Sequence, residues 1–271
     1  MATAPARVAW VTGASSGIGR AVALQLAREG WRVAASARGA DALAGLAAEA
    51  PRGTVAAYPL DVTDGPALHA VVAEIERALG PIDRAVLNAG THKPVTADRF
   101  SAAPFKALLQ TNVIGTVHGL EALIPPMQGR GRGQIAVVAS VAGWRGLPTA
   151  AAYGASKAAL INMAEALRPE LAALGIDLRL VNPGFVETPL TAKNRFPMPF
   201  LISAEAAADR ICRGLDGSGF EISFPRRFTW VLKCLRILPY RLYFPIIRRR
   251  TGLGPAGSTR RSGLTRPSSS A

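Results

Sequence analysis

The sequence predicts an α/β fold in which a parallel, doubly wound sheet carries helices on both faces. Three observations predict it. Buried apolar runs alternate with helix-like stretches, a glycine-rich turn follows the first run, and a chain of 271 residues with 49% hydrophobic residues is long enough for one large core. This alternation implies right-handed crossovers between parallel strands, and no internal repeat interrupts it.

Seven short apolar runs are the predicted strands. They span residues 7–12, 31–37, 54–60, 82–87, 134–139, 176–181 and, as a short last strand, 221–224. Helices are predicted between them, from the glycine turn through Ala27 and over residues 66–79, 101–126, 154–173 and 203–215. The helix over 66–79 places Leu68, Val72 and Ile75 on one face, and Ser203 is the predicted N-cap of the helix over 203–215.

The composition argues against a disulfide-rich, metal-binding or membrane-spanning protein. The two cysteines, Cys212 and Cys234, and the three scattered histidines lack partners at ligand spacing, so we expect no metal site. His92 follows Asn88-Ala89-Gly90, and we expect it to be exposed to solvent; the alternative is a position at the edge of the active-site cleft. No run of about 18 apolar residues is present. The first strand begins near Arg7, which leaves no room for a signal peptide, so the expected location is cytoplasmic.

Positive charge is concentrated towards the C-terminus. The net charge is +14, but residues 1–224 account for only +3, whereas residues 225–271 hold 11 basic residues and no acidic one. This asymmetry indicates an anionic partner for the C-terminal segment, either a membrane surface or nucleic acid.

The turn after the first predicted strand has the composition of a phosphate-binding turn. It reads Thr12-Gly13-Ala14-Ser15-Ser16-Gly17-Ile18-Gly19, with the glycine spacing G-x-x-x-G-x-G. Glycines allow a tight turn and a close approach of the backbone to a pyrophosphate. The N-terminus of the next helix offers free N–H groups and a positive dipole end. The turn therefore predicts a dinucleotide site, although an ordinary strand-to-helix turn is the alternative.

The end of the second predicted strand indicates which dinucleotide is bound. A carboxylate there would bind the ribose 2′-hydroxyl of NAD. The chain has Ser36-Ala37-Arg38 instead, and the planar guanidinium of Arg38 can pair with a 2′-phosphate. We therefore predict NADP in preference to NAD; the alternative is that Arg38 is an ordinary surface arginine.

A tyrosine and a lysine with helical spacing are the candidate catalytic pair. Tyr153 and Lys157 stand four residues apart near the start of a predicted helix, so they share a face. An ammonium beside the phenol, together with the charge of an oxidised nicotinamide, would lower the tyrosine pKa. The phenol could then exchange a proton with a carbonyl or alcohol oxygen. Ser140 ends a predicted strand at the edge where open α/β sheets bind ligands, and its hydroxyl could hold the same oxygen.

In their order along the chain, these motifs resemble the short-chain dehydrogenase/reductase family. The resemblance covers residues 7 to about 224 and rests on Thr12–Gly19, Asn88-Ala89-Gly90, Ser140, Tyr153-x-x-x-Lys157 and Pro183-Gly184. It implies a single Rossmann-like domain with a seven-stranded parallel sheet, and an NAD(P)-dependent oxidoreductase acting on CH–OH groups.

The resemblance also implies roles for the catalytic residues. Tyr153 would be the acid/base, and Lys157 would bind the nicotinamide ribose and depress the tyrosine pKa. Ser140 would orient the substrate carbonyl, and Asn112 would hold a water in a proton relay. It further implies a homodimer or homotetramer formed through the helices over 101–126 and 154–173.

The cofactor contacts that the resemblance implies come from five segments of the chain. The segments are the glycine turn (Gly13, Ser15, Ser16, Gly17, Ile18 and Gly19), Arg38 as argued above from the strand end, the adenine-binding pair Asp61-Val62, the Asn88-Ala89-Gly90 segment and, near the carboxamide, Pro183, Gly184, Val186 and Thr188. Tyr153 and Lys157 would contact the cofactor as well.

The resemblance places a substrate lid over residues 189–202, within a lid region that extends to residue 215. This lid is apolar and rich in proline. It contains Phe196, Pro197, Met198, Pro199, Phe200, Leu201 and Ile202. An apolar lid indicates a lipophilic substrate, although packing of the lid against the body would give the same composition.

Residues 225–250 form a predicted basic amphipathic segment. A helical projection gives the segment an apolar side and a basic side, while Trp230 and Ile237 break the pattern. The apolar side holds Phe228, Val231, Leu232, Leu235, Leu238 and Leu242, and the basic side holds Arg226, Lys233, Arg236 and Arg241. Two prolines, at positions 239 and 245, are expected to interrupt any helix. The segment fits an interfacial anchor on an anionic membrane surface. The alternatives are a helical hairpin packed on the body or a neighbouring subunit and, least favoured beside a near-neutral body, nucleic-acid binding.

The sequence as a whole predicts one catalytic domain over 1–224, the amphipathic segment over 225–250 and a disordered tail over 251–271. The predicted activity is NADP-dependent hydride transfer between NADPH and a lipophilic carbonyl or alcohol. The alternative is an NADP-binding sensing or docking module without turnover. We expect no nucleic-acid partner, and peripheral membrane location if the amphipathic segment binds lipid.

Overall fold

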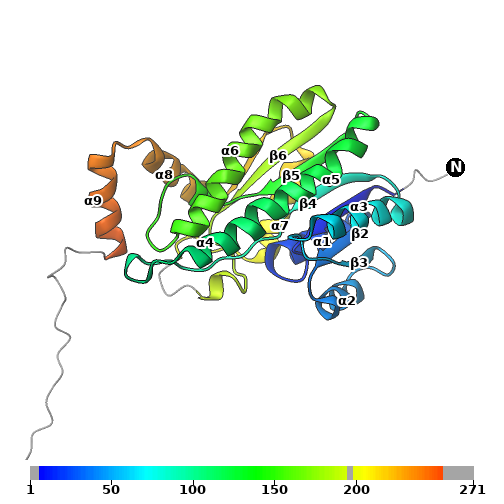
Figure 1. Ribbon diagram of the computed structural model, residues 1–271, viewed down its shortest axis with the longest axis horizontal. Helices are drawn as coiled ribbons and strands as arrows, with labels where there is room; N and C mark the ends of the chain where they lie inside the picture. The colour runs from blue at the N-terminus through cyan, green and yellow to red at the C-terminus, as the bar shows by residue number, and fades with distance from the viewer. Residues whose placement is uncertain (1–5, 194–197, 253–271) are drawn as a thin grey trace, which may run out of the picture.

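A seven-stranded, wholly parallel sheet forms the centre of the computed structural model, which describes residues 6–193 and 198–252 (Figure 1). The strand order is β3-β2-β1-β4-β5-β6-β7, so β1 lies beside β4 where the direction of winding reverses. The strands are β1 (Val8–Thr12), β2 (Arg32–Ala37), β3 (Val55–Pro59), β4 (Ile82–Leu87), β5 (Gly133–Val138), β6 (Ile176–Pro183) and β7 (Glu221–Phe224). The predicted fold class is confirmed.

Helices cover both faces of the sheet, each over its own hydrophobic core. On one face lie α1 (Gly17–Arg28), α2 (Ala40–Glu49) and α7 (Ala204–Asp216). On the other lie α3 (Gly65–Leu79), α5 (Gly115–Gly129) and α6 (Ala151–Ala173), with α4 (Ala102–Leu108) packed against α6. The central strands are buried on both sides, which explains their continuous apolar runs.

Three elements differ from the sequence-based expectation. Helix α2 was not predicted, because it is rich in alanine and buries only Leu43 and Leu46. The predicted helix over 101–126 is instead α4 and α5, joined by a π-helical stretch, η2 (Leu109–Ile114). Residues 225–250 form two helices, α8 (Arg226–Ile237) and α9 (Tyr240–Thr251). Pro239 separates them as expected, but α9 continues through Pro245, which removes one hydrogen bond without ending the helix.

The tail predicted to be disordered, residues 251–271, lies outside the described residues from position 253 onwards. Within the described ranges no helix is long and apolar enough to cross a membrane.

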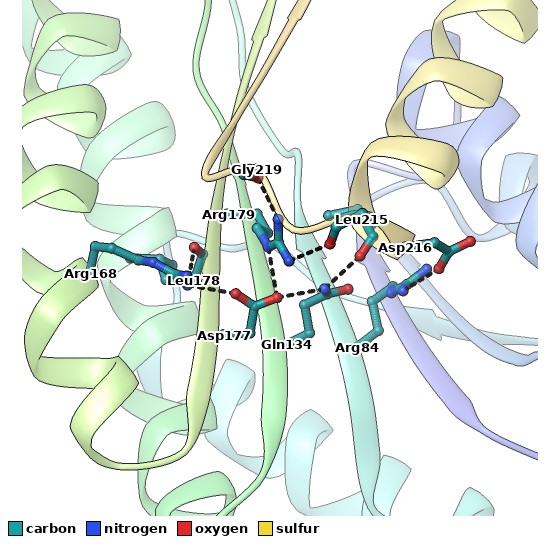
Figure 2. A network of polar contacts seen from close by, with 10 residues as sticks. Arg84, Gln134, Arg168, Asp177, Leu178, Arg179, Leu215, Asp216 and Gly219 are labelled. Carbon is teal, nitrogen blue, oxygen red and sulfur yellow. Dashed lines mark hydrogen bonds and ion pairs between the residues drawn. The ribbon is translucent and has the colours of Figure 1, made fainter.

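A polar network ties the amino-terminal ends of the strands to α6 (Figure 2). The carboxylate of Asp177, on β6, accepts hydrogen bonds from Arg168 of α6 at 2.5 Å, from Arg179 at 2.7 Å and from Gln134 of β5 at 2.8 Å. Burial alone would raise the pKa of Asp177, but these three donors hold it below its usual value.

The same network reaches the loop between α7 and β7. Gln134 donates to the Leu215 carbonyl at 2.8 Å, and Arg179 donates to the carbonyls of Gly217 and Gly219. Arg84, buried on β4, pairs with Asp216 at 2.8 Å (Figure 2). The carboxyl edge of the sheet, opposite this network, is left for the site.

We predict that Asp177→Asn destabilises the chain by about 2 kcal/mol near neutral pH, because an amide NH₂ would face three donors. A carboxylate whose pKa is depressed by folding stabilises the fold above its unfolded pKa of about 3.9. That contribution is lost as pH falls through the folded pKa. The free energy of unfolding, measured with urea, should therefore differ less between the variant and the unsubstituted chain below about pH 4.

Asp98→Asn is the matched control, since Asp98 is exposed and its nearest partner, Arg99, is 3.9 Å away. If the loss of unfolding free energy in Asp177→Asn stays constant from pH 7 to pH 3, the charge of Asp177 does not have the assigned role.

Candidate active site

The glycine turn between β1 and α1 allows a close approach of two backbone segments. Gly13 has φ +66°, and a Cβ there would lie 2.9 Å from the Ala89 Cα and from the Asn88 amide nitrogen. A side chain is therefore excluded both by conformation and by space. Ser16, the N-cap of α1, makes no side-chain cap hydrogen bond, so its side chain leaves the first N–H groups of the helix without a cap at the end where Gly17 and Ile18 line the cleft.

Asn88 and Thr12 brace this turn against β4. The buried Thr12 hydroxyl accepts the N–H groups of Asn88 and Ala89, at 3.0 and 3.1 Å. In return the Asn88 side-chain amide donates to the carbonyls of Thr12, at 3.1 Å, and Gly13, at 3.4 Å. Four hydrogen bonds thus fix the carboxyl ends of two neighbouring strands relative to each other.

A cleft of about 650 Å³ opens along the carboxyl edge of the sheet beyond the turn. Every residue predicted for catalysis or cofactor binding lines this cleft except Gly19 and Asn112. Gly19 packs under the turn, where a Cβ would collide with the Gly13 carbonyl and the Asn88 amide. Asn112 lies behind the cleft wall and is fully buried. The structure thus brings the predicted residues together, while their individual roles stay predictions.

One end of the cleft has the groups that an adenosine phosphate needs. Ser36 is buried, and its hydroxyl accepts a hydrogen bond from the Trp10 indole at 2.9 Å, so it is turned away from the cleft. Arg38 is exposed at the cleft wall. Asp61 accepts hydrogen bonds from Thr63 that lower its pKa, and the charge of Arg38 lowers it further. The guanidinium of Arg38 and the carboxylate of Asp61 thus both stand at this end of the cleft.

The other end of the cleft joins the three candidate catalytic side chains. Tyr153, the third residue of α6, lies beside Ser140, which stands two residues beyond the end of β5 and whose hydroxyl donates to the Pro183 carbonyl at 3.4 Å. Lys157 is buried, with its Nζ 5.8 Å from the centre of the Tyr153 ring and donating to the Val138 carbonyl at 2.8 Å. Ser140 also caps η3 (Val141–Gly143) by accepting the Ala142 N–H at 3.2 Å.

The pKa values of the pair differ from the sequence-based expectation. Burial raises the pKa of Tyr153, and the hydrogen bond from Ser140 only partly offsets this. Burial also lowers the pKa of Lys157 to about 8. Among the protein's own groups, the predicted lowering of the phenol pKa by the ammonium is therefore not found, because burial determines the direction of both shifts. The phenol is protonated at neutral pH.

Asn112 supports the catalytic end of the cleft from inside η2. Its carboxamide oxygen accepts the Thr91 N–H at 2.7 Å, and its NH₂ donates to the Thr91 carbonyl at 3.0 Å and to the Ser156 hydroxyl at 2.9 Å. The whole side chain is thus engaged with protein groups that hold the loop after β4. The π-helical turn around it is a local irregularity of the kind found at functional sites.

His92 was expected to be exposed, and this was wrong. Its imidazole is half-buried and packs edge-on against the Tyr153 ring, with the centroids 4.7 Å apart. Burial lowers its pKa, so the ring is neutral at neutral pH. The loop from Gly90 brings His92 beside α6, a tertiary contact that no local pattern in the sequence reveals.

The predicted lid folds back on the body by two backbone contacts. Glu187 donates its N–H to the Ile202 carbonyl at 2.8 Å, and Ile202 donates to the Phe185 carbonyl at 3.2 Å. The Phe228 ring of α8 lies between those of Phe185 and Phe200, at 5.4 and 6.1 Å. Phe196 and Pro197, part of the predicted lid, lie outside the described residues.

No group of histidine, cysteine, aspartate or glutamate side chains in the described part of the chain could hold a metal ion. Cys212 is buried on α7, and burial raises the pKa of its thiol to about 12, which makes it unreactive.

Comparison with known proteins agrees with this geometry. Residues 7–198 match the family described as short chain dehydrogenase. An uncharacterised oxidoreductase of Myxococcus xanthus is 39% identical over 251 residues, which are 92% of this chain and 99% of the relative. The ketoacyl reductase HetN of Nostoc is 35% identical over 228 residues, 82% of this chain and 79% of its own.

A solved structure shares the fold over a similar share of the chain. The short-chain dehydrogenase of Burkholderia cenocepacia in complex with NADP superposes with a TM-score of 0.77 and 25% identity, covering 92% of this chain and 98% of that one.

Proposed function

Because the chain belongs to the short-chain dehydrogenase/reductase family, we propose that it reduces a lipophilic ketone with NADPH. The observation that carries the proposal is a single cleft in which the glycine turn and Arg38 stand at one end and Ser140, Tyr153 and Lys157 at the other. Bound NADPH would supply the hydride. The residues of the chain then have to bind the carbonyl, donate a proton to it and exclude water.

Each catalytic side chain has one task in this reaction. The Ser140 hydroxyl donates to the substrate carbonyl oxygen and holds it beside Tyr153. The phenol delivers the proton to that oxygen as it becomes an alkoxide. A raised tyrosine pKa supports the reductive direction, because the protonated phenol is the form that reduction consumes. The ammonium of Lys157 stabilises the phenolate left behind.

Two observations support NADPH as the cofactor. Arg38 is at the cleft wall beyond β2, no acidic residue occurs among Ser36, Ala37 and Arg38, and the Ser36 hydroxyl is engaged with Trp10. The structural relative from Burkholderia cenocepacia is described in complex with NADP.

The substrate class rests on the lid and on the relatives. Phe200 and Leu201 are exposed apolar residues of the lid, and Phe185 and Phe228 continue the aromatic cluster inward. The named relative from Nostoc is a ketoacyl reductase. A 3-ketoacyl thioester, with a ketone and a hydrocarbon tail, fits both features.

We predict that the purified chain oxidises NADPH with 3-ketoacyl thioesters and that kcat/KM rises with chain length. Each further buried methylene contributes about 0.8 kcal/mol, or roughly a fourfold gain, until the apolar surface is covered. Tyr153→Phe should lower kcat at least about 100-fold while the Kd for NADPH stays within about threefold, because the proton donor is lost and the fold is kept.

Tyr58→Phe, which removes a phenol from β3 outside the cleft, is the matched control and should leave kcat unchanged. NADPH binding without turnover over a broad panel of ketones would support a binding module in place of an enzyme.

We predict that Arg38→Asp reverses the cofactor preference. Loss of the charged hydrogen bonds to a 2′-phosphate should raise the KM for NADPH about 10- to 100-fold. The new carboxylate can accept the 2′-hydroxyl of NADH, so kcat/KM for NADH should rise. Arg52→Asp, at an exposed arginine outside the cleft, is the control. Unchanged NADPH kinetics in Arg38→Asp would show that Arg38 is a surface residue.

We predict that kcat/KM for NADPH is constant from pH 6.5 to 7.5 and falls above pH 8. Lys157 has a pKa of about 8, so its ammonium is present below that pH and lost above it. In Lys157→Arg the charge persists at high pH, and any residual activity should lose this decline. A profile for the unsubstituted chain that is flat to pH 9.5 would exclude the ammonium from the rate.

A further inference from the structure

Helices α8 and α9 form a defined element on the outside of the domain, at the far left of Figure 1. Phe228 and Leu232 of α8 pack into the core beside α6. Arg145 donates to the carbonyls of Leu235 and Arg236 at 2.6 and 2.8 Å, at the end of α8. These contacts hold the helices in a fixed orientation, so the faces that they turn to solvent are also fixed.

Helix α9 is attached mainly through one side chain. Tyr243 is buried, its hydroxyl donates to the Gly146 carbonyl at 2.6 Å, and the Arg145 guanidinium lies 3.9 Å from its ring centre. Three other large apolar residues of this helix, Tyr240, Leu242 and Phe244, are more than half exposed, and Ile246 is 38% exposed.

The outer face of α8 is the side that the sequence pattern did not assign as apolar. Leu232 and Leu235 are half-buried towards the body, whereas Trp230 is 69% and Ile237 82% exposed. These two residues and exposed Cys234 stand at positions i, i+4 and i+7, so they form one stripe facing solvent. Leu232 therefore packs on the body, whereas Val231, which was predicted on the same side, is 55% exposed together with the two residues that broke the amphipathic pattern.

Basic residues surround this apolar surface. Between positions 225 and 252 the sequence has 8 basic residues and no acidic one. They are Arg226, Arg227, Lys233, Arg236, Arg241, Arg248, Arg249 and Arg250, and all are exposed. Lys233 also pairs with Glu221 of β7 at 2.6 Å, which leaves most of the charge to the outward faces.

We propose that α8 and α9 dock the protein on the surface of an anionic lipid bilayer. Exposed tryptophan, tyrosine, phenylalanine and isoleucine side chains would enter the interface between headgroups and hydrocarbon, while the arginines contact lipid phosphates. No helix of the described residues could cross the bilayer, so the contact is interfacial.

Charge and chemistry favour this occupant over two others. A second copy docked on the same surface would bring two sets of like charges together without an acidic residue to offset them. Nucleic acid would satisfy the arginines but would leave Ile237 and Leu242 in water. An anionic bilayer is complementary to both the charge and the apolar side chains.

The docking surface is connected to the two segments that border the cleft. Arg145 and Gly146, which hold α8 and α9, lie in the loop between Ser140 and Tyr153. Phe228 of α8 contacts Phe200 of the lid region and Phe185, which follows β6 just before that region. The proposal goes beyond the proposed function, since it concerns binding of the protein to lipid and does not require turnover.

The test uses the intrinsic fluorescence of the full chain with vesicles. Of the four tryptophans, Trp10, Trp31 and Trp144 are buried, so Trp230 is the one whose surroundings would change. With vesicles of 70% phosphatidylcholine and 30% phosphatidylglycerol, emission should shift to shorter wavelength and the protein should co-sediment. With phosphatidylcholine alone it should do neither, and raising NaCl from 50 to 500 mM should release it.

Two sets of variants separate the apolar and the charged contributions. Trp230→Ser with Ile237→Ser, and Arg226→Gln with Arg227→Gln, should each lower the partition coefficient at least about tenfold, since each arginine contributes roughly fivefold. The control pair Arg52→Gln with Arg132→Gln removes the same amount of charge from the body. It should change the partition coefficient less than about twofold. Far-UV circular dichroism checks that each variant is folded.

Three results would overturn the proposal. One is the absence of both sedimentation and spectral shift for the unsubstituted chain with anionic vesicles in 50 mM NaCl. Another is equal loss of binding in the control pair, which would assign the attraction to net charge alone. The third is a concentration-dependent dimer, or a complex with duplex DNA, that buries Trp230 while vesicles do not.

Discussion

The structure of the site depends on the place where β1 and β4 end side by side, just beyond the last hydrogen bonds between the two strands. Strand order reverses there, so the two carboxyl ends diverge and leave a crevice. The reciprocal hydrogen bonds between Thr12 and the Asn88 segment keep that crevice from widening. They fix the glycine turn against the strand that leads to Gly90. Gly90 in turn lies close to Asn112 and Lys157, since a Cβ there would be 3.3 and 3.5 Å from their polar atoms. The cofactor end and the catalytic end are therefore built on one rigid connection.

Local sequence signals predicted most of this arrangement. The predicted strand over 82–87 and the N-cap at Ser203 agree with the structure, because buried runs and caps are decided within a few residues. The same holds for the glycine turn and the pair on α6. Helix α2 was missed because an alanine-rich helix with two buried leucines has little periodicity. The π-helical η2 was missed because its cause is tertiary: the Asn112 carboxamide is held by Thr91 and Ser156, which come from other elements.

Electrostatics and surface faces were beyond the reach of the sequence. Helical spacing placed Tyr153 and Lys157 on one side of α6, but it carried no information on how deeply the two groups are buried. Burial decides the direction of both pKa shifts. Likewise, the projection of the C-terminal segment found an apolar side and a basic side, but not which side the body would cover. Phe228 and Leu232 pack against the core, whereas Trp230 and Ile237 are left outside, and so are Val231 and Leu242 of the predicted apolar side.

The attachment of α8 and α9 has a consequence for how a docked protein would be oriented. A basic segment on a flexible linker would let the catalytic domain tumble above a bilayer, and substrate would then have to leave the lipid to reach it. Here Arg145 and Tyr243 hold the two helices to the loop between Ser140 and Tyr153, and Phe228 holds α8 to the lid region. These contacts leave no flexible spacer between the exposed apolar surface and the cleft. On a bilayer, the same contacts that orient the helices would fix the direction in which the cleft opens, and a lipophilic ketone in the membrane would meet a site held at constant height above it.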